Sequence, residues 1–136
     1  MPPNTPSKLT FTQSFQKLIR SFGYAFNGIK HATLTELNFR IHLVATLITV
    51  LAGYALHINN MEWLWVGLCI TLVLVTELLN TAIERLTDLV SPAYHPIAGH
   101  VKDIAAGAVT IMTFFAIITG GVIFLPKLIN LIHHAA

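Results

Sequence analysis

Three long apolar runs restrict the fold of this chain more than any other feature. They cover residues 41–58, 61–79 and 104–125, and each is close to the roughly 20 residues that a helix needs to cross a bilayer. Within the hydrocarbon layer every backbone N–H and C=O must be bonded internally, and a helix achieves this on its own. The sequence therefore predicts an all-α membrane protein with three transmembrane helices.

The composition supports this class and excludes others. The chain has 136 residues, enough for one domain, and we expect a single membrane domain over residues 1–136. Only 10% of the residues are charged, against about 25% in an ordinary soluble domain. The net charge of +2 is too small to indicate a nucleic-acid partner. The single Cys69 lies in an apolar run, so we expect neither a disulfide framework nor a cysteine metal site.

Two segments precede the first apolar run. Residues 1–10 lack the apolar core of a signal peptide and are expected to form a short disordered lead. Residues 11–32 are amphipathic, with basic and polar residues between apolar ones at helical spacing. The apolar positions are Phe15, Leu18, Ile19, Phe22, Phe26 and Ile29. This pattern predicts a surface helix that lies in the headgroup plane.

The ends of the apolar runs are marked by polar residues and prolines. Asn59-Asn60 predicts a turn, and Trp63 and Trp65 are placed to anchor the second span at the interface. We expect the second helix to continue past the membrane to Val90. Ser91–Pro96 should then break it, and Pro126 should end the third span, because proline cannot donate a helical hydrogen bond.

The distribution of Lys and Arg predicts the orientation. The segment before the first span and the 85–102 connection are basic, whereas residues 57–62 contain no Lys or Arg. Basic flanking segments remain in the cytoplasm. We therefore expect the N-terminus and residues 77–102 to face the cytoplasm.

A polar stripe interrupts the second helix where it leaves the apolar run. Asn80 and Glu84 follow Glu77 by three and seven residues, so all three side chains share one helix face. Two carboxylates on one face repel each other unless a cation lies nearby. A charged side chain at a membrane edge is also costly unless it is paired, solvated or bound to metal. The stripe is thus typical of a functional site rather than of packing.

The predicted topology brings further polar residues to the same interface. They are Glu36, Asp88, His95, Lys102 and Asp103. Carboxylate and amide oxygens suit Mg²⁺ together with phosphate oxygens, and one carboxylate is a candidate base for a lipid hydroxyl. Such a set suits phosphoryl transfer, in which positioning and charge neutralisation dominate.

Two structural interpretations remain open. Asp88 is equally consistent with a solvated residue at the helix end, and Lys102-Asp103 with a charge pair that favours the dipole of the next helix. For the whole chain, the alternative function is that of a non-catalytic membrane assembly or transporter subunit. It would use its carboxylates only for helix pairing and would depend on neither ATP nor Mg²⁺.

Four motifs give the chain a family resemblance. They are Glu77-Leu-Leu-Asn-Thr-Ala-Ile-Glu-Arg-Leu-Thr-Asp88, Tyr94-His95, Lys102-Asp-Ile-Ala-Ala-Gly-Ala108 and Thr35-Glu-Leu-Asn-Phe-Arg40. Taken in chain order, over roughly residues 15–121, they resemble the prokaryotic diacylglycerol kinases, small membrane lipid kinases that include undecaprenol kinases. The resemblance implies a homotrimer in the bacterial cytoplasmic membrane. It also implies transfer of the γ-phosphoryl group of ATP, with Mg²⁺, to diacylglycerol or undecaprenol.

The resemblance also implies residue roles. Glu77 matches the general base, and Glu36 and Glu84 match the magnesium ligands. The expected ATP contacts are Lys17, Tyr24, Glu36, Asn80, Glu84, Tyr94, His95, Lys102 and Asp103. The expected lipid acceptor contacts are Glu77, Arg40 and Ala106.

Two positions depart from the proteobacterial members of the family. Lys17 stands where they have Arg, so a bidentate phosphate contact is lost, and Arg20 is the alternative contact. His42 stands where they have an acid. The Arg40-Ile41-His42 run and the Ser91–Pro96 break look more like the undecaprenol branch, and both lipid acceptors stay open.

Overall fold

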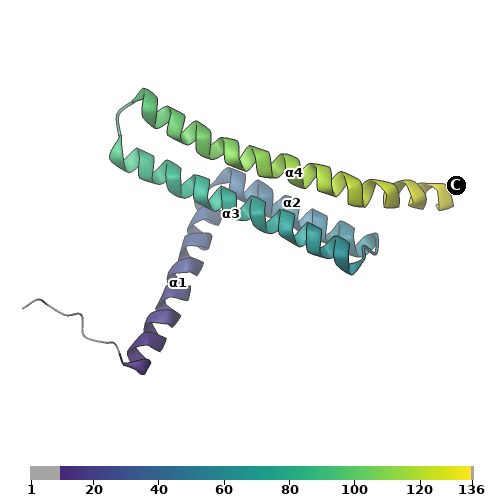
Figure 1. Cartoon of the computed structure of the whole chain (residues 1–136), viewed down its shortest axis with the longest axis horizontal. Coiled ribbons are helices and arrows are strands. Elements are labelled where there is room, and N and C mark those ends of the chain that lie inside the picture. The colour runs from purple at the N-terminus through teal and green to yellow at the C-terminus, as the bar shows by residue number, and fades with distance from the viewer. Residues whose placement is uncertain (1–9, 136) are drawn as a thin grey trace, which may run out of the picture. The chain divides into compact units, whose positions relative to one another are not determined.

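A computed structural model describes residues 10–135 and contains four helices, with no strand among those residues. The helices are α1 (Phe11–Thr35), α2 (Leu37–Ala55), α3 (Asn60–Val90) and α4 (Pro96–Ala135) (Figure 1). The prediction of an all-α fold is confirmed. The predicted disordered lead covers residues 1–10, and residues 1–9 of it lie outside the part of the chain that the structure describes. The chain divides after Thr35 into two compact units, the first containing α1 and the second containing α2, α3 and α4.

Helix α1 has the amphipathic pattern that the sequence predicts, and it extends three residues beyond the predicted end at residue 32. Its apolar side chains are largely exposed, with Phe15, Phe22 and Phe26 among them. An amphipathic helix in this state is suited to the membrane surface, because its apolar face has no partner within its own unit.

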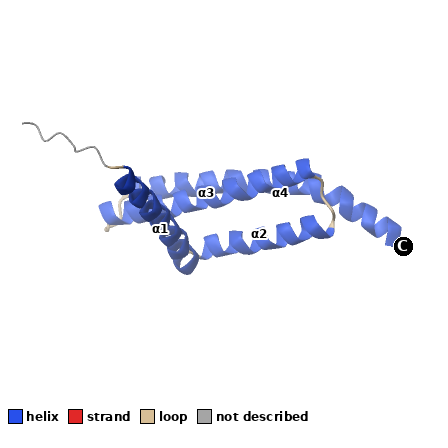
Figure 2. Ribbon diagram, turned by 90° about the horizontal axis from the view of Figure 1, so that it is seen from below, coloured by secondary structure: helices blue, strands red, loops and turns tan. Residues whose placement is uncertain are grey.

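In the second unit, α2, α3 and α4 lie side by side, and each runs antiparallel to the next (Figure 2). Helix α3 packs against both neighbours and more extensively against α4. A small buried cluster of Ile58, Val66 and Ile123 closes one end of the unit. All three helices are long and apolar enough to cross a membrane, so the chain is a multi-pass membrane protein with three candidate spans.

The connection between α2 and α3 is tight and well capped. His57 has φ of 48°, and α2 therefore ends at Ala55, three residues before the predicted end of the first span. Asn59 accepts a hydrogen bond from the Glu62 backbone N–H at 2.9 Å, and the Glu62 carboxylate accepts one from the Asn59 backbone at 2.7 Å. This reciprocal capping box defines the first turn of α3.

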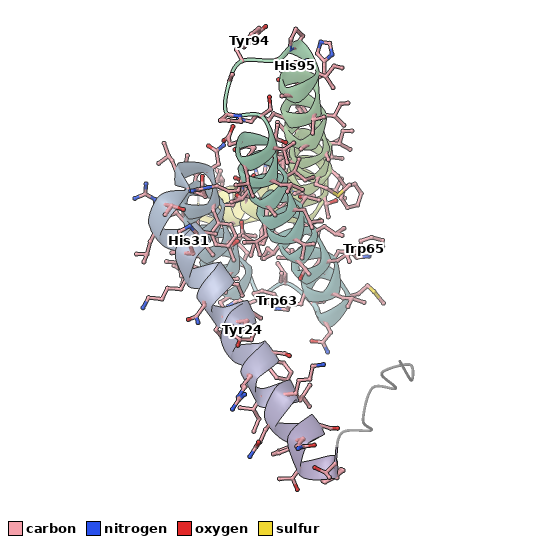
Figure 3. All side chains as sticks on the ribbon, turned by 90° about the vertical axis from the view of Figure 1, so that its left-hand side faces the viewer. Tyr24, His31, Trp63, Trp65, Tyr94 and His95 are labelled. Carbon is pink, nitrogen blue, oxygen red and sulfur yellow. The ribbon has the colours of Figure 1, made fainter. Side chains whose placement is uncertain are left out.

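Gly53 allows the two helices to approach closely at this turn. A Cβ atom at Gly53 would lie 2.7 Å from the ring of Trp63, and the Trp63 ring packs on Tyr54 with centroids 4.9 Å apart. An aromatic pair at the end of two apolar helices is typical of the membrane interface. Figure 3 shows Trp63 and Trp65 far from Tyr94 and His95, which lie at the opposite end of the unit.

The α3–α4 connection follows the predicted break. Helix α3 continues to Val90 as predicted, and α4 begins at Pro96, a position where the missing N–H costs nothing. Nδ1 of His95 accepts a hydrogen bond from the backbone N–H of Ile97 at 3.2 Å. His95 thereby satisfies one of the N–H groups that the first turn leaves without a helical partner.

The sequence predicts that the third span ends at Pro126, but the helix itself does not end there. Helix α4 continues through Pro126 to Ala135, and in Figure 1 its last turns project beyond the α2–α3 turn. Proline removes one donor from the helix, but an apolar helix at a membrane boundary tolerates this loss when solvent or a neighbouring group satisfies the carbonyl. Leu128, Ile129, Leu131 and Ile132 continue the apolar pattern beyond the proline.

Candidate active site

Glu77 and Asn80 are the buried polar residues of the described chain, with 3% and 5% of their surface exposed. They lie on the face of α3 that the sequence predicts, and both line a pocket of about 370 Å³ with Glu84. Helix α2 contributes Asn38 and His42 to the lining, and α4 contributes Ala106, Val109, Thr110, Thr113, Phe114 and Ile117. The predicted stripe on α3 therefore lies in a pocket that three helices build.

The hydrogen bonding of this stripe is incomplete within the described residues. The Asn80 amide donates to the Glu84 carboxylate at 2.9 Å. The buried Oδ1 atom of Asn80 has no partner among the described residues. Leaving a buried polar atom unpaired costs about 1–3 kcal/mol. An arrangement of this kind is stable when a ligand supplies the missing partner, so the pocket is suited to one.

Several charged or titratable groups surround Glu77. His42, Glu84 and Glu36 are close enough to act on its charge, although the part of the chain that the structure describes shows no hydrogen bond to the Glu77 carboxylate. Two of the predicted acids, Glu77 and Glu84, line this pocket, and Glu36 is near enough to act on the charge of Glu77. Their mutual repulsion favours a bound cation.

Arg85 holds Glu36 in this group. Its guanidinium donates to Oε1 of Glu36 at 2.6 Å, which ties the start of α2 to the last turns of α3. Glu84 is the neighbour of Arg85 in the chain, so the ion pair brings the two predicted magnesium ligands to the same end of the unit. Within residues 10–135, no group of three or more His, Cys, Asp or Glu side chains is placed to hold a metal.

Lys102 forms an ion pair with Asp88 across the α3–α4 connection, with Nζ and Oδ1 2.5 Å apart. Asp88 therefore has a partner and is not simply a solvated residue at the helix end. The pair is about half exposed and adds little stability on that account. Its geometric effect is to fix the Lys102 ammonium near the last turns of α3.

The other predicted site residues lie outside the pocket that contains Glu77, except Ala106, which lines it. Tyr94 is 92% exposed in the α3–α4 connection, and His95 lines a separate hollow at that connection. Arg40 and Asp103 are exposed on α2 and α4. In the first unit, Lys17, Arg20 and Tyr24 line one hollow on α1, so the surface of α1 offers both of the basic residues that the sequence left as alternatives.

The sequence did not reveal every residue of the site. Arg85 was not singled out, although it follows Glu84 directly and is an arginine at the end of an acidic stripe. Asn38, Thr110 and Thr113 face the pocket from helices far apart in the sequence, and no local motif marks such positions. His42 stands out in the sequence as a departure from the proteobacterial members of the family, and in the structure it lines the same pocket as Glu77.

A buried carboxylate and amide in a pocket formed by three membrane-length helices define a small multi-pass membrane protein with an acidic site at one end of its spans. Residues 23–124 match the family model of prokaryotic diacylglycerol kinase, and the chain belongs to that family. It is a lipid kinase, a phosphotransferase, and not a non-catalytic assembly or transporter subunit.

Individual relatives carry two different names. The chain is 39% identical over 112 residues to an undecaprenol kinase of Bacillus subtilis (strain 168), covering 82% of this chain and 91% of that protein. It is 39% identical over 127 residues to a diacylglycerol kinase of Synechocystis sp., covering 93% and 73%. Against a diacylglycerol kinase of Escherichia coli (strain K12) it is 32% identical over 108 residues, covering 79% and 88%.

Proposed function

We propose that the protein transfers the γ-phosphoryl group of ATP to the hydroxyl group of a membrane lipid alcohol at the cytoplasmic face, with Glu77 as general base. The observation that carries this assignment is the burial of Glu77 beside Asn80 and Glu84, in a pocket between three apolar helices. A lipid hydroxyl reaches such a pocket laterally from the bilayer, whereas a water-soluble alcohol gains nothing from the apolar surroundings.

The chemistry requires one proton acceptor. Glu77 takes the proton of the acceptor hydroxyl as its oxygen forms a bond to the γ-phosphorus, and the bond from that phosphorus to the bridging oxygen of ADP breaks. Since phosphoryl transfer is dominated by positioning and charge neutralisation, the other polar residues act mainly by holding the nucleotide. Lys102, fixed by Asp88, is placed to neutralise phosphate charge.

The residues present fit a magnesium ion. Glu36 and Glu84 would hold it, because Mg²⁺ is commonly bound by one or two carboxylates, with substrate phosphates completing its coordination. The small number of acidic ligands beside α3 agrees with this mode. When bound, the ion neutralises negative charge on the phosphate oxygens. Arg85 orients the Glu36 carboxylate through their ion pair, and Asn80 orients the Glu84 carboxylate through a hydrogen bond.

The remaining proposed nucleotide contacts lie at the same end of α3 and α4 and on α1. Asn80, Tyr94, His95, Lys102 and Asp103 are assigned to the second unit. Lys17 and Tyr24 are assigned to α1, with Arg20 as the alternative to Lys17. The shared hollow on α1 supports this set, because it combines two cationic side chains with an aromatic ring.

We assign the acceptor to the diacylglycerol or undecaprenol class, in contact with Glu77, Arg40 and Ala106. The names of the relatives support both lipids. Ala106 lines the same pocket as Glu77, and its small side chain leaves room for an acceptor headgroup.

We further propose a homotrimer in a bacterial cytoplasmic membrane, with the N-terminus and the active site on the cytoplasmic side. Within one chain, only 11%, 22% and 11% of the most apolar part of α2, α3 and α4 is buried. Lipid or other copies must cover the rest. The excess of Lys and Arg before α2 and between α3 and α4 supports the orientation.

The test is an assay with purified protein, γ-labelled ATP, Mg²⁺ and a panel of alcohols in detergent micelles. We expect label on undecaprenol, dioleoylglycerol or both, and none on glycerol. Labelling that depends on the lipid and disappears with excess EDTA supports the assignment. Phosphorylation of glycerol alone, or of no alcohol, would refute it.

A further inference from the structure

The last turns of α4, after Pro126, present an apolar surface that lies apart from the candidate active site. Residues 125–136 are outside the 23–124 stretch that matches the family model. Four large apolar side chains of this segment are 43–66% exposed. They are Leu128, Ile129, Leu131 and Ile132. Adjacent apolar side chains that are exposed in this way indicate a contact with something outside the chain.

Two ion pairs mark the length of α4 that fits within a bilayer. Lys102 pairs with Asp88 near the start of α4, and Lys127 pairs with Glu62 at 3.0 Å where α3 begins. From position 102 to position 127 the helix rises about 38 Å at 1.5 Å per residue, against about 30 Å for the hydrocarbon core of a bilayer. Charged side chains are costly inside that core, so the two pairs lie at its two surfaces. Residues 128–135 therefore extend about 12 Å further, past the hydrocarbon.

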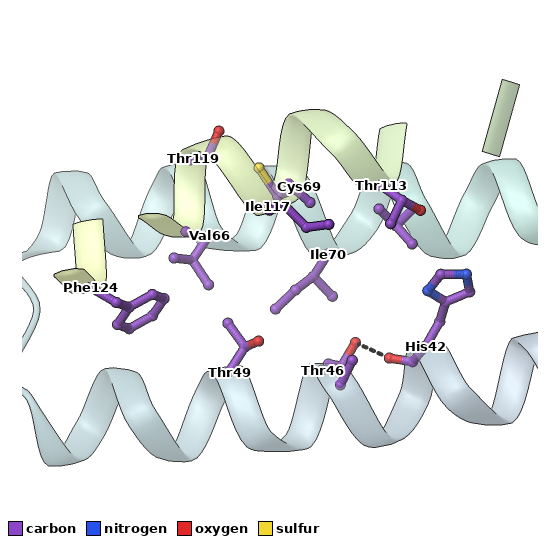
Figure 4. A pocket seen from close by; sticks show the side chains of 14 residues that line it. His42, Thr46, Thr49, Val66, Cys69, Ile70, Thr113, Ile117, Thr119 and Phe124 are labelled. Atoms are coloured by element: carbon purple, nitrogen blue, oxygen red, sulfur yellow. Dashed lines mark hydrogen bonds between the residues drawn. The ribbon is translucent and has the colours of Figure 1, made fainter. Parts of the chain in front are cut away.

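The packing of α4 against its neighbours ends just before this segment. Ile123 belongs to the buried cluster at this end of the unit, and Phe124 packs against that cluster. Figure 4 shows Phe124 directed into the space between the helices, as is Val66 of α3. Two residues later, Pro126 removes a helical N–H donor. Helices bend most readily at such a position, so the last turns are free to take a direction of their own.

The exposed apolar stripe of the span continues across the proline. Successive members follow at intervals of three, four and three residues, which places them on one helix face, and all are exposed: Val122, Leu125, Ile129 and Ile132. Ile123, on the opposite face, is buried. Asn130 is exposed and lies about 100° round the helix from Ile129. The segment 128–135 contains no Asp, Glu, Lys or Arg, so it is amphipathic without being charged.

We propose that residues 128–135 form a lipid-binding surface segment, which bends at Pro126 and inserts its apolar face into the headgroup layer on the side of the bilayer where the α2–α3 turn lies. Phospholipid is the partner that the observations favour, because the stripe continues the uncovered apolar surface of a membrane span. Four partly exposed side chains are too few for the roughly 800 Å² per partner that a standard protein interface buries. The proposal does not rest on the kinase function.

The first test compares two neighbouring positions on different faces. Ile129→Cys and Asn130→Cys each carry a nitroxide label, in protein reconstituted into palmitoyl-oleoyl-phosphatidylcholine vesicles. Collisions with oxygen, which dissolves in lipid, and with a water-soluble nickel chelate are measured by electron paramagnetic resonance. We expect the oxygen-to-nickel ratio to be about threefold or more higher at position 129 than at position 130. Unaltered protein treated with the same reagent controls for the buried Cys69.

The other outcomes of this test overturn the proposal. High nickel accessibility at both positions would place the segment in water. Low accessibility to both reagents at position 129, with spin–spin broadening between copies, would show that a second copy covers the face. Because the segment is uncharged, replacing part of the phosphatidylcholine with phosphatidylglycerol should leave the ratio unchanged. A ratio that rises only with phosphatidylglycerol would contradict insertion through apolar side chains.

A second measurement uses the unaltered protein and needs no variant. A phosphatidylcholine with a diazirine group close to its ester linkage is photolysed in the same vesicles, and the labelled residues are mapped by mass spectrometry. We expect label on Leu128, Ile129 and Ile132 as well as on Leu125. Label that stops at Leu125 would refute contact between the segment and lipid.

The bend is tested by restoring the missing donor. Pro126→Ala returns the N–H group and stiffens the helix, so the oxygen-to-nickel ratio at position 129 should fall towards the value at position 130. Gly121→Ala is the matched control, because it also stiffens α4 and its added Cβ would meet no atom within 4 Å. We expect the ratio to keep its value in Gly121→Ala. The same ratio in Pro126→Ala as in the unaltered sequence would refute a bend at the proline.

Discussion

Helix α3 carries an acid in its first turn and another about 22 Å further along its axis, and their surroundings differ completely. Glu62 bonds to the backbone of Asn59 at 2.7 Å and to Nζ of Lys127 at 3.0 Å. Glu77 is more deeply buried, and the described residues show no hydrogen bond to its carboxylate. Two glutamates on one helix therefore differ in burial and in hydrogen bonding.

This difference distinguishes Glu62, whose partners lie within the chain, from Glu77, the proposed general base. The partners of Glu62 satisfy its charge within the chain, so the first turn of α3 is complete without a ligand. Burial of Glu77 and of the unpaired Asn80 oxygen costs stability. Such a loss of stability is tolerated where a bound substrate or cation supplies the missing interaction. Polar groups within membrane helices commonly have this kind of role.

Exchanging each acid for its amide tests this contrast most strongly. Glu77→Gln preserves side-chain shape but removes the proton acceptor, and we expect turnover to fall about a hundredfold or more with nucleotide binding largely kept. Glu62→Gln should leave turnover close to that of the unaltered protein. Initial rates at saturating ATP and lipid measure both. Near-normal turnover in Glu77→Gln would remove Glu77 from the role of base.

The next prediction asks whether one chain supplies the whole site. Subunits carrying Glu77→Gln are mixed with subunits carrying Lys102→Ala, each inactive or nearly so alone. If these residues meet across a subunit boundary, mixed trimers contain intact sites and recover a measurable part of the activity. No recovery, with subunit exchange demonstrated by a tag on one partner, would place each site within a single chain.

Much of this architecture could be predicted from the sequence, because its signals are local. Apolar length predicted three spans, and helical spacing predicted the shared face of Glu77, Asn80 and Glu84. Residues that meet through tertiary packing could not be found in this way. Glu36 and Arg85 are 49 positions apart in the sequence and share no motif, yet they form an ion pair. The wall provided by Thr110 and Thr113 likewise depends on the packing of α4 on α3.

Pro126 shows where the boundary of a helix could not be predicted from one residue alone. The proline was expected to mark the end of the span, but helix α4 continues for nine more residues to Ala135. The apolar pattern beyond the proline and the ion pair of Lys127 with Glu62 favour continuation. Tertiary contacts therefore outweighed the preference of one residue.

The metal assignment predicts an intermediate effect. Glu36→Gln and Glu84→Gln should each raise the Mg²⁺ concentration needed for half-maximal activity by about tenfold or more, since loss of even an outer partner of a metal ligand costs that much. Because the two carboxylates lie at one end of the unit, the double variant should deviate from additivity. Titration of activity with Mg²⁺ measures this. Unchanged Mg²⁺ dependence in both single variants would contradict the assignment.

The smallest expected effect concerns the structural end of α3. Asn59→Ala removes the side chain that caps the helix, and loss of such a cap costs about 1 kcal/mol in the free energy of unfolding. Asn60→Ala is the matched control, because Asn60 is the next residue, is exposed, and shows no side-chain hydrogen bond within the described residues. Unfolding in mixed micelles with increasing denaturing detergent should distinguish the two variants.

Turnover is the second readout of this experiment. If the first turn of α3 serves only to hold the fold together, Asn59→Ala should be less stable but turn over lipid at the rate of the unaltered protein at a temperature where both are folded. Equal stability of Asn59→Ala and Asn60→Ala would show that the capping box contributes nothing measurable. A turnover defect in the folded Asn59→Ala protein would show that the first turn of α3 affects the site about 22 Å away. The proposed division of α3 into a structural end at Glu62 and a catalytic end at Glu77 would then be wrong.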